Sequence, residues 1–124
     1  MQGMLAFQNA PPFAAPLRFF LTAPLFSLAA GLLVAAGGPE LLESRWTPGL
    51  LAATHLITVG FMLQVMLGAM IQILPVVAGA NLSSPLRLAG SVHASLVLGA
   101  LVLCAAFLSF SPHLFKIAAL FFAV

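Results

Sequence analysis

The chain has 124 residues, of which 63% are hydrophobic and only 5% are Asp, Glu, Lys or Arg. Soluble domains carry roughly 25% charged residues, so this composition excludes a water-soluble protein and makes lipid the solvent for most of the surface. Four cations and two acids give a formal net charge of +2. Such a small charge excludes a basic surface for nucleic acid. We therefore predict a single all-α transmembrane helix bundle over residues 1–124, with the lipid bilayer as its first partner.

Three apolar stretches, residues 17–37, 50–77 and 88–110, are long enough to cross a hydrocarbon core of ~30 Å as helices. In the first, Pro24 is the expected position of a kink. The second would reach about 40 Å as a continuous helix, so we expect it to tilt, protrude or break near Pro75. Residues 114–124 reach only about 17 Å. We interpret them as the incomplete start of a fourth span, either in a fragment or packed on a partner.

The segments outside these stretches indicate the orientation only weakly. Residues 2–16 contain three prolines and are expected to form an arm at the membrane interface, and residues 40–48 hold both acids and the only Trp. The cations divide evenly between the two predicted ends, with Arg18 and Arg87 at one and Arg45 and Lys116 at the other. We predict a cytoplasmic N-terminus and a location in the bacterial inner membrane.

Polar chemistry within the predicted spans is limited to a few residue types. No Asp or Glu lies in any span, which argues against a proton-coupled carrier. The sequence also has no Gly-rich phosphate loop and no His-Glu-x-x-His motif. Histidine, methionine and glutamine remain as candidates, and whether the chain is an enzyme stays open.

His55 lies near the start of the second predicted span, where its ring needs a partner. It is either a ligand of haem or of a metal, or a structural His bonded to a neighbouring helix. His93 lies at a similar position in the third span, which runs in the opposite direction. The two rings should therefore differ in depth by roughly 15 Å or more, too far to share one iron in one chain. Ser91, Ser95 and Gly99 beside His93 favour helix packing there.

His113 lies at the mouth of the fourth stretch, at the same end as His55. It could reach the same cofactor, but polarity costs little at the interface, so we expect a solvated His. Met62, Met66 and Met70 recur every four residues, and Met62 follows His55 by about two turns. They are packing residues, an adaptable wall for a flat macrocycle, or thioether ligands for Cu(I) together with His55. Of the two functional interpretations, we favour the wall.

A second pattern along the same span combines small and amide side chains every four residues. Its members are Gly60, Gln64, Gly68 and Gln72. Glycines allow close backbone approach and the amides need hydrogen-bond partners, so the pattern predicts a helix–helix seam. The facing helix could belong to the same chain or to a second copy.

The order Thr54-His55-Leu56, Gly60-Phe61, Gly68-Ala69 and Leu74-Pro75 with Gly79 resembles the second helix of haem-bearing relatives of the haem–copper oxidase catalytic subunit. The NnrS-type membrane proteins belong to that group. The resemblance covers about residues 17–110 and implies that His55 is an axial ligand of a low-spin haem b toward the outer side of the membrane. The family's second axial His and its copper ligands lie on later helices that this chain does not contain.

The sequence therefore predicts a membrane haem b-binding protein for electron transfer or for haem or gas sensing. Its candidate cofactor residues are His55, His93, His113, Met62 and Met66, and its candidate metal ligands are His55 and His93. The missing ligand would come from a second copy in a homodimer or from the rest of a larger membrane complex. The alternatives are a copper-binding protein that uses His55, Met62 and Met66, and a structural subunit without cofactor.

Overall fold

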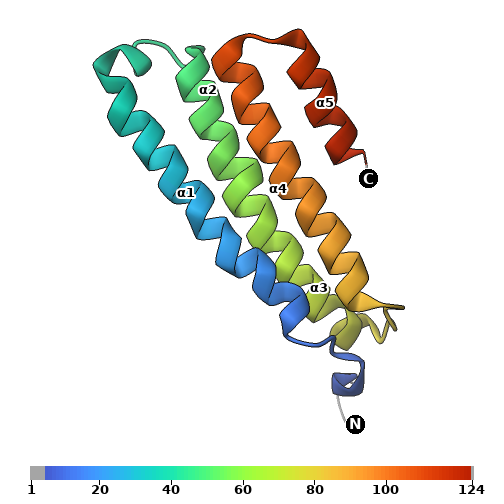
Figure 1. Ribbon diagram of the computed structural model, residues 1–124. Helices are drawn as coiled ribbons and strands as arrows, with labels where there is room; N and C mark the ends of the chain where they lie inside the picture. Colours follow the sequence, from blue (N-terminus) through green and yellow to red (C-terminus); the bar gives the residue numbers. More distant parts are fainter. Residues whose placement is uncertain (1–4, 124) are drawn as a thin grey trace.

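The computed structural model describes residues 5–123, which form helices and connecting turns without any β-strand. Figure 1 shows the long helices side by side, with the short last helix beside the end of its neighbour. The second long helix consists of three consecutive segments, α2, η2 and α3. In chain order the elements are η1 (Phe7–Asn9), α1 (Ala14–Leu41), α2 (Pro48–His55), η2 (Leu56–Leu63), α3 (Gln64–Ala78), α4 (Pro85–Ser109) and α5 (Pro112–Phe122).

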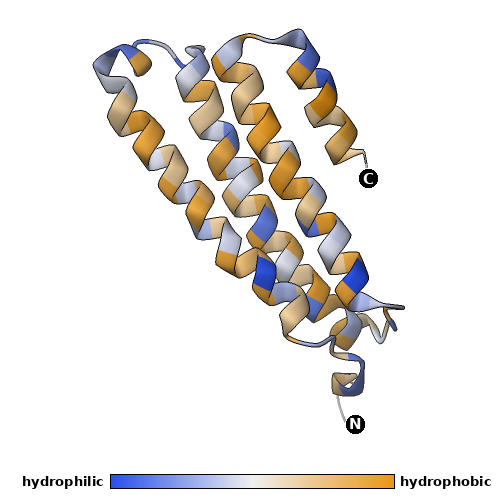
Figure 2. Ribbon diagram, viewed as in Figure 1, coloured by the Kyte–Doolittle hydropathy of each residue, from blue (hydrophilic) through white to orange (hydrophobic). Residues whose placement is uncertain are grey.

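Three helices are long and apolar enough to cross a membrane: α1 with 28 residues, Pro48–Ala78 with 31 and α4 with 25. The predicted fold class is confirmed, and each predicted span matches one of these helices to within a few residues at either end. The shorter α5 covers the fourth predicted stretch except its end, where Val124 lies outside the described residues. Figure 2 shows apolar residues along all the helices. The chain is thus an integral membrane protein whose apolar helices contact the lipid bilayer.

Proline and glycine set the helix boundaries. Pro48, Pro85 and Pro112 each occupy the first residue of a helix, where the missing N–H costs no hydrogen bond. In α1 the backbone leaves helical angles at Gly38 (φ 63°, ψ −166°) and not at Pro24, where we expected a kink. The residue before Pro39 is disfavoured in the helical region, and glycine tolerates the positive φ.

The second span does not break near Pro75 but continues to Ala78 and ends at Gly79, which has a positive φ of 64°. The N-terminal arm satisfies carbonyl groups at this end. The Ala6 N–H donates to the Val76 carbonyl oxygen at 2.9 Å, and Asn9 Nδ2 donates to the Gly79 carbonyl oxygen at 2.9 Å. The arm therefore caps the end of α3.

The core lies where α1 and α4 pack against the second span. One cluster of buried side chains contains Phe26, Ala30, Ala53, Leu56 and Ala100, and a second contains Ala15, Phe19 and Ala89. The small alanines permit the close helix approach typical of membrane bundles. α5 packs along α4, where the Ser95 hydroxyl donates to the Phe121 carbonyl oxygen.

Candidate functional site

A polar cluster joins the three long helices inside the bundle. It consists of Thr22 on α1, Gln64 at the start of α3 and His93 on α4. Thr22 Oγ1 lies 2.6 Å from Gln64 Oε1 and 2.8 Å from His93 Nε2. The Gln64 side chain is fully buried. These contacts link three helices through one buried and two partly buried side chains.

The acceptor at one end of the cluster fixes the direction of its hydrogen bonds. Gln64 Nε2 donates to the Gly60 carbonyl oxygen at 2.6 Å, and a carbonyl can only accept. Gln64 Oε1 therefore faces Thr22, whose single hydroxyl proton is shared between Gln64 Oε1 and the Arg18 carbonyl oxygen at 2.9 Å. His93 must in turn donate to Thr22 Oγ1 through a protonated Nε2. The ring nitrogen that would ordinarily bind a metal is thus occupied, and only Nδ1 of His93 is left for a ligand.

The π-helix η2 precedes this cluster and supplies its terminal acceptor. A π-helix is rare and is usually found as a short insertion at a functional or strained position. Gly60 lies within it and is buried against α1, because a Cβ built on Gly60 would overlap the Phe26 ring. Gly68 faces Phe19 in the same way, with 3.0 Å between a built Cβ and Phe19 Cβ.

The predicted seam therefore lies against α1 of the same chain at Gly60, Gln64 and Gly68. Gln72, the fourth member of the pattern, does not join it. Its Oε1 is buried and lacks a hydrogen-bond partner among the described residues.

His55 has a different environment from His93. Its Nδ1 lies 2.7 Å from the Leu51 carbonyl oxygen, one turn earlier in α2. Because the carbonyl can only accept, Nδ1 carries the proton and Nε2 keeps a lone pair. No group in residues 5–123 forms a hydrogen bond with that nitrogen. The half-buried ring stacks on Phe107 of α4 with 4.6 Å between centroids and 30° between planes.

The other predicted residues are dispersed around the bundle. Met62 and Met66 lie on the outer surface of the second span with 51% and 58% of their area exposed. His113 is exposed in the first turn of α5. Phe115 of α5 contacts Phe107 edge-to-face at 4.9 Å, which links α5 to the His55 ring through one aromatic side chain. Within residues 5–123, no three His, Cys, Asp or Glu side chains gather as a metal site.

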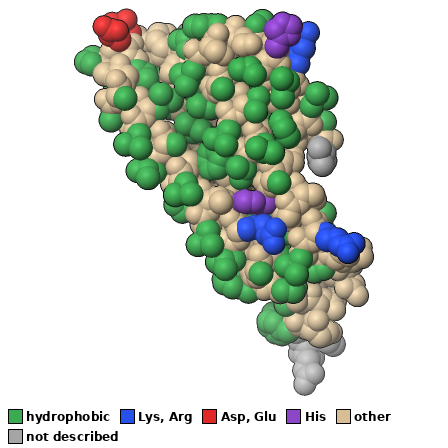
Figure 3. Space-filling view, in the orientation of Figure 1, with side chains coloured by type: hydrophobic (Ala, Val, Ile, Leu, Met, Phe, Trp, Pro, Cys, Tyr) green, Lys and Arg blue, Asp and Glu red, His purple; other side chains and the backbone are tan. Residues whose placement is uncertain are grey.

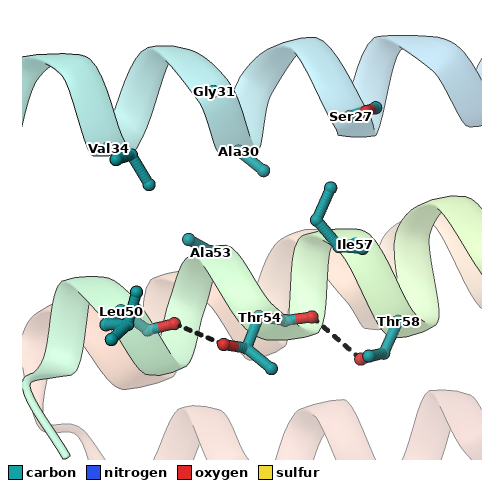
Figure 4. A pocket seen from close by; sticks show the side chains of 9 residues that line it. All are labelled: Ser27, Ala30, Gly31, Val34, Leu50, Ala53, Thr54, Ile57 and Thr58. Atoms are coloured by element: carbon teal, nitrogen blue, oxygen red, sulfur yellow. Dashed lines mark hydrogen bonds between the residues drawn. The ribbon is translucent and has the colours of Figure 1, made fainter. Parts of the chain in front are cut away.

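A hollow of about 610 Å³ lies between α1 and the α2–η2 part of the second span and is not lined by His55. Figure 4 shows small and apolar residues on both walls, among them Ala30, Gly31 and Ala53. Two of its three hydroxyl groups bind their own helix: Thr54 Oγ1 donates to the Leu50 carbonyl oxygen and Thr58 Oγ1 to the Thr54 carbonyl oxygen. This surface suits apolar contact and offers little to orient a polar ligand.

Comparison with protein-family models, with curated proteins and with solved structures gives no match to this chain. The fold and the site therefore define its class, an α-helical membrane protein with an internal hydrogen-bonded cluster and a separate His with a free ring nitrogen.

Thr22 is a site residue that the sequence alone did not identify. Its signal is a hydroxyl residue inside an otherwise apolar span, one turn beyond Arg18.

Replacing Thr22 by valine should destabilise the bundle by about 1–3 kcal/mol, because it leaves His93 Nε2 and Gln64 Oε1 without partners at nearly unchanged volume. Thermal unfolding in mild detergent, followed by labelling of Cys104, would measure the change. Thr58→Val is the matched control, since that hydroxyl is exposed and bonds only its own helix. Equal stabilities of the two variants would show that the cluster contributes nothing.

Proposed function

We propose that this membrane protein binds haem b through Nε2 of His55 and serves electron transfer or haem or gas sensing. The observation that carries the proposal is the Nδ1 hydrogen bond to the Leu51 carbonyl oxygen. Histidines that bind metals commonly donate the second ring nitrogen to such an acceptor, which fixes the tautomer and orients the ring. A neutral imidazole with a free Nε2 is the usual protein ligand of haem iron.

The surroundings of His55 fit an axial ligand. Stacking on Phe107 restricts rotation of the ring, and Leu56 and Ala52 beside it are buried apolar residues. Bound haem b would supply one-electron chemistry or a site for a diatomic gas. The chain itself would supply the ligand nitrogen, its tautomer and the Phe107 ring that orients the imidazole.

A second protein ligand for such a haem would have to come from beyond the immediate surroundings of His55. His93 is committed to Thr22, so its Nε2 does not serve this purpose. His113 lies at the same end of the bundle as His55 and is exposed. We propose that a second copy or another part of a larger inner-membrane complex completes the site, since a two-fold axis along the membrane normal keeps equivalent residues at equal depth.

A reduced-minus-oxidised visible spectrum with iron and copper analysis tests the proposal. The wild type, purified in detergent from haem-replete cells, should show a b-type spectrum and bound iron, and His55→Ala should lose both because the axial nitrogen is gone. Met66→Ala is the control, because its exposed side chain lies outside the proposed ligand set. Colourless, iron-free wild type would overturn the haem proposal. Copper lost from both variants would instead favour the site of His55, Met62 and Met66.

A further inference from the structure

The acids of this chain lie at one end of the bundle, whereas its cations occur at both ends. Glu40 is in the last turn of α1 and Glu43 follows it in the connection to α2, and the sequence has no other acid. Arg18 and Arg87 lie at the opposite end, near the starts of α1 and α4. Figure 3 shows the acids at the upper extremity, and cations with a histidine both at that extremity and on the lower half of the visible face. The two arginines therefore have no carboxylate side chain at their end of the molecule.

The Arg18 side chain reaches α4 at Gly90, a residue without a side chain. Its Nε makes one long contact, 3.4 Å, with the Ala14 carbonyl oxygen of its own helix. Arg18 Nη1 would be 3.0 Å from a Cβ built on Gly90. The guanidinium therefore lies next to the space that a larger side chain at position 90 would occupy. Arg87 is exposed one turn nearer the start of α4. Arg18 and Arg87 thus both lie near Gly90, and the long contact with Ala14 is the one hydrogen bond that the Arg18 side chain makes among residues 5–123.

The depth and the surroundings of Arg18 and Gly90 match a lipid headgroup. Arg18 is about 6 Å along α1 from its first residue, and Gly90 is about 7.5 Å along α4, which places both near the interface. Leu21, Leu86 and Leu88 around them are 64%, 44% and 42% exposed, so acyl chains can cover the adjoining surface. Arginine binds phosphate oxygens with paired N–H donors. A phosphate linked to acyl chains would satisfy both halves of this surface.

We propose that the surface around Arg18, Gly90 and Arg87 binds the phosphate of an anionic phospholipid. Lipid is favoured over free phosphate and over an acidic protein segment because exposed leucines adjoin the arginines, and acyl chains would cover this apolar surface. This proposal is independent of His55 and of haem. Loss of one cation near an anionic membrane surface corresponds to about a fivefold change in affinity.

Native mass spectrometry of the full chain in neutral detergent tests the site. Phosphatidylglycerol and phosphatidylcholine are added at equal mole fraction, and bound lipid is counted. We expect the wild type to retain phosphatidylglycerol in preference, and Arg18→Gln to reduce that retention about fivefold. Arg45→Gln is the matched control, because Arg45 lies at the acidic end with its guanidinium 5.3 Å from the Trp46 ring centroid. Retention in Arg45→Gln should equal that of the wild type.

A second variant tests whether the position of the Arg18 guanidinium matters when its charge is kept. Gly90→Leu keeps every cation but fills the space beside the Arg18 guanidinium, whose Nη1 lies 3.0 Å from the position of a Cβ at residue 90, so it should also lower phosphatidylglycerol retention while the helical circular-dichroism spectrum is preserved. Equal retention of the two lipids by the wild type, or unchanged retention in both variants, would overturn the proposal. Displacement of the lipid by excess inorganic phosphate would also overturn it, because the site would then recognise the free anion.

Discussion

Replacing Gly60 by alanine is expected to lower the free energy of unfolding by about 1–3 kcal/mol, the usual cost of adding volume to a packed core. The new Cβ would overlap the Phe26 ring, and Gly60 lies in the π-helix where its own carbonyl oxygen accepts the Gln64 side chain. The backbone therefore cannot move away from α1 without stretching that hydrogen bond. Phe26 belongs to the main core cluster, and its Cβ would lie 2.8 Å from the new Cβ, so rotation of the ring alone does not remove the overlap.

The measurement is thermal unfolding in detergent, with Cys104 as the reporter. Cys104 packs against the same core cluster and is the only cysteine, so its reaction with a thiol reagent follows exposure of this core. Gly31→Ala is the matched control, because a Cβ at Gly31 meets no atom within 4 Å. We expect Gly31→Ala to be neutral or slightly stabilising. If Gly60→Ala were as stable as Gly31→Ala, the close approach of α1 to η2 would be wrong.

The spans were predictable because hydropathy alone decides them in a membrane protein. Runs of apolar residues long enough for the bilayer and prolines at the first helical positions indicated most of the fold. The π-helix was not predictable, since a single added residue per turn leaves composition unchanged and only shifts which side chains share a face. The Gly60 and Gln64 seam was visible in the spacing, but only the structure shows that α1 of the same chain covers it.

The histidines show what sequence could not resolve about the candidate site. His55 and His93 looked alike, each near the start of an apolar span. Their difference arises from one tertiary contact, the Thr22 hydroxyl that engages His93 Nε2, and from one local contact, the Leu51 carbonyl oxygen that engages His55 Nδ1. Which nitrogen is left free depends on these partners, and neither is apparent from the position of a histidine in a hydropathy pattern.

The proposed role of His55 Nε2 as an iron ligand is tested most directly by replacing the side chain with free imidazole. His55→Gly should lose the b-type spectrum and its iron, because no side chain in the vacated position carries a ligand nitrogen. Haem and millimolar imidazole added together to the purified variant should restore the spectrum, since the imidazole can occupy the space beside Phe107.

His93→Gly is the control, because the His93 ring binds Thr22. Its loss should lower the stability of the protein and leave the haem content largely unchanged. The predicted result is an imidazole-dependent b-type spectrum in His55→Gly and a b-type spectrum without added imidazole in His93→Gly. A His55→Gly protein that keeps the wild-type spectrum without imidazole would contradict the account, because the iron ligand would then lie elsewhere in the protein.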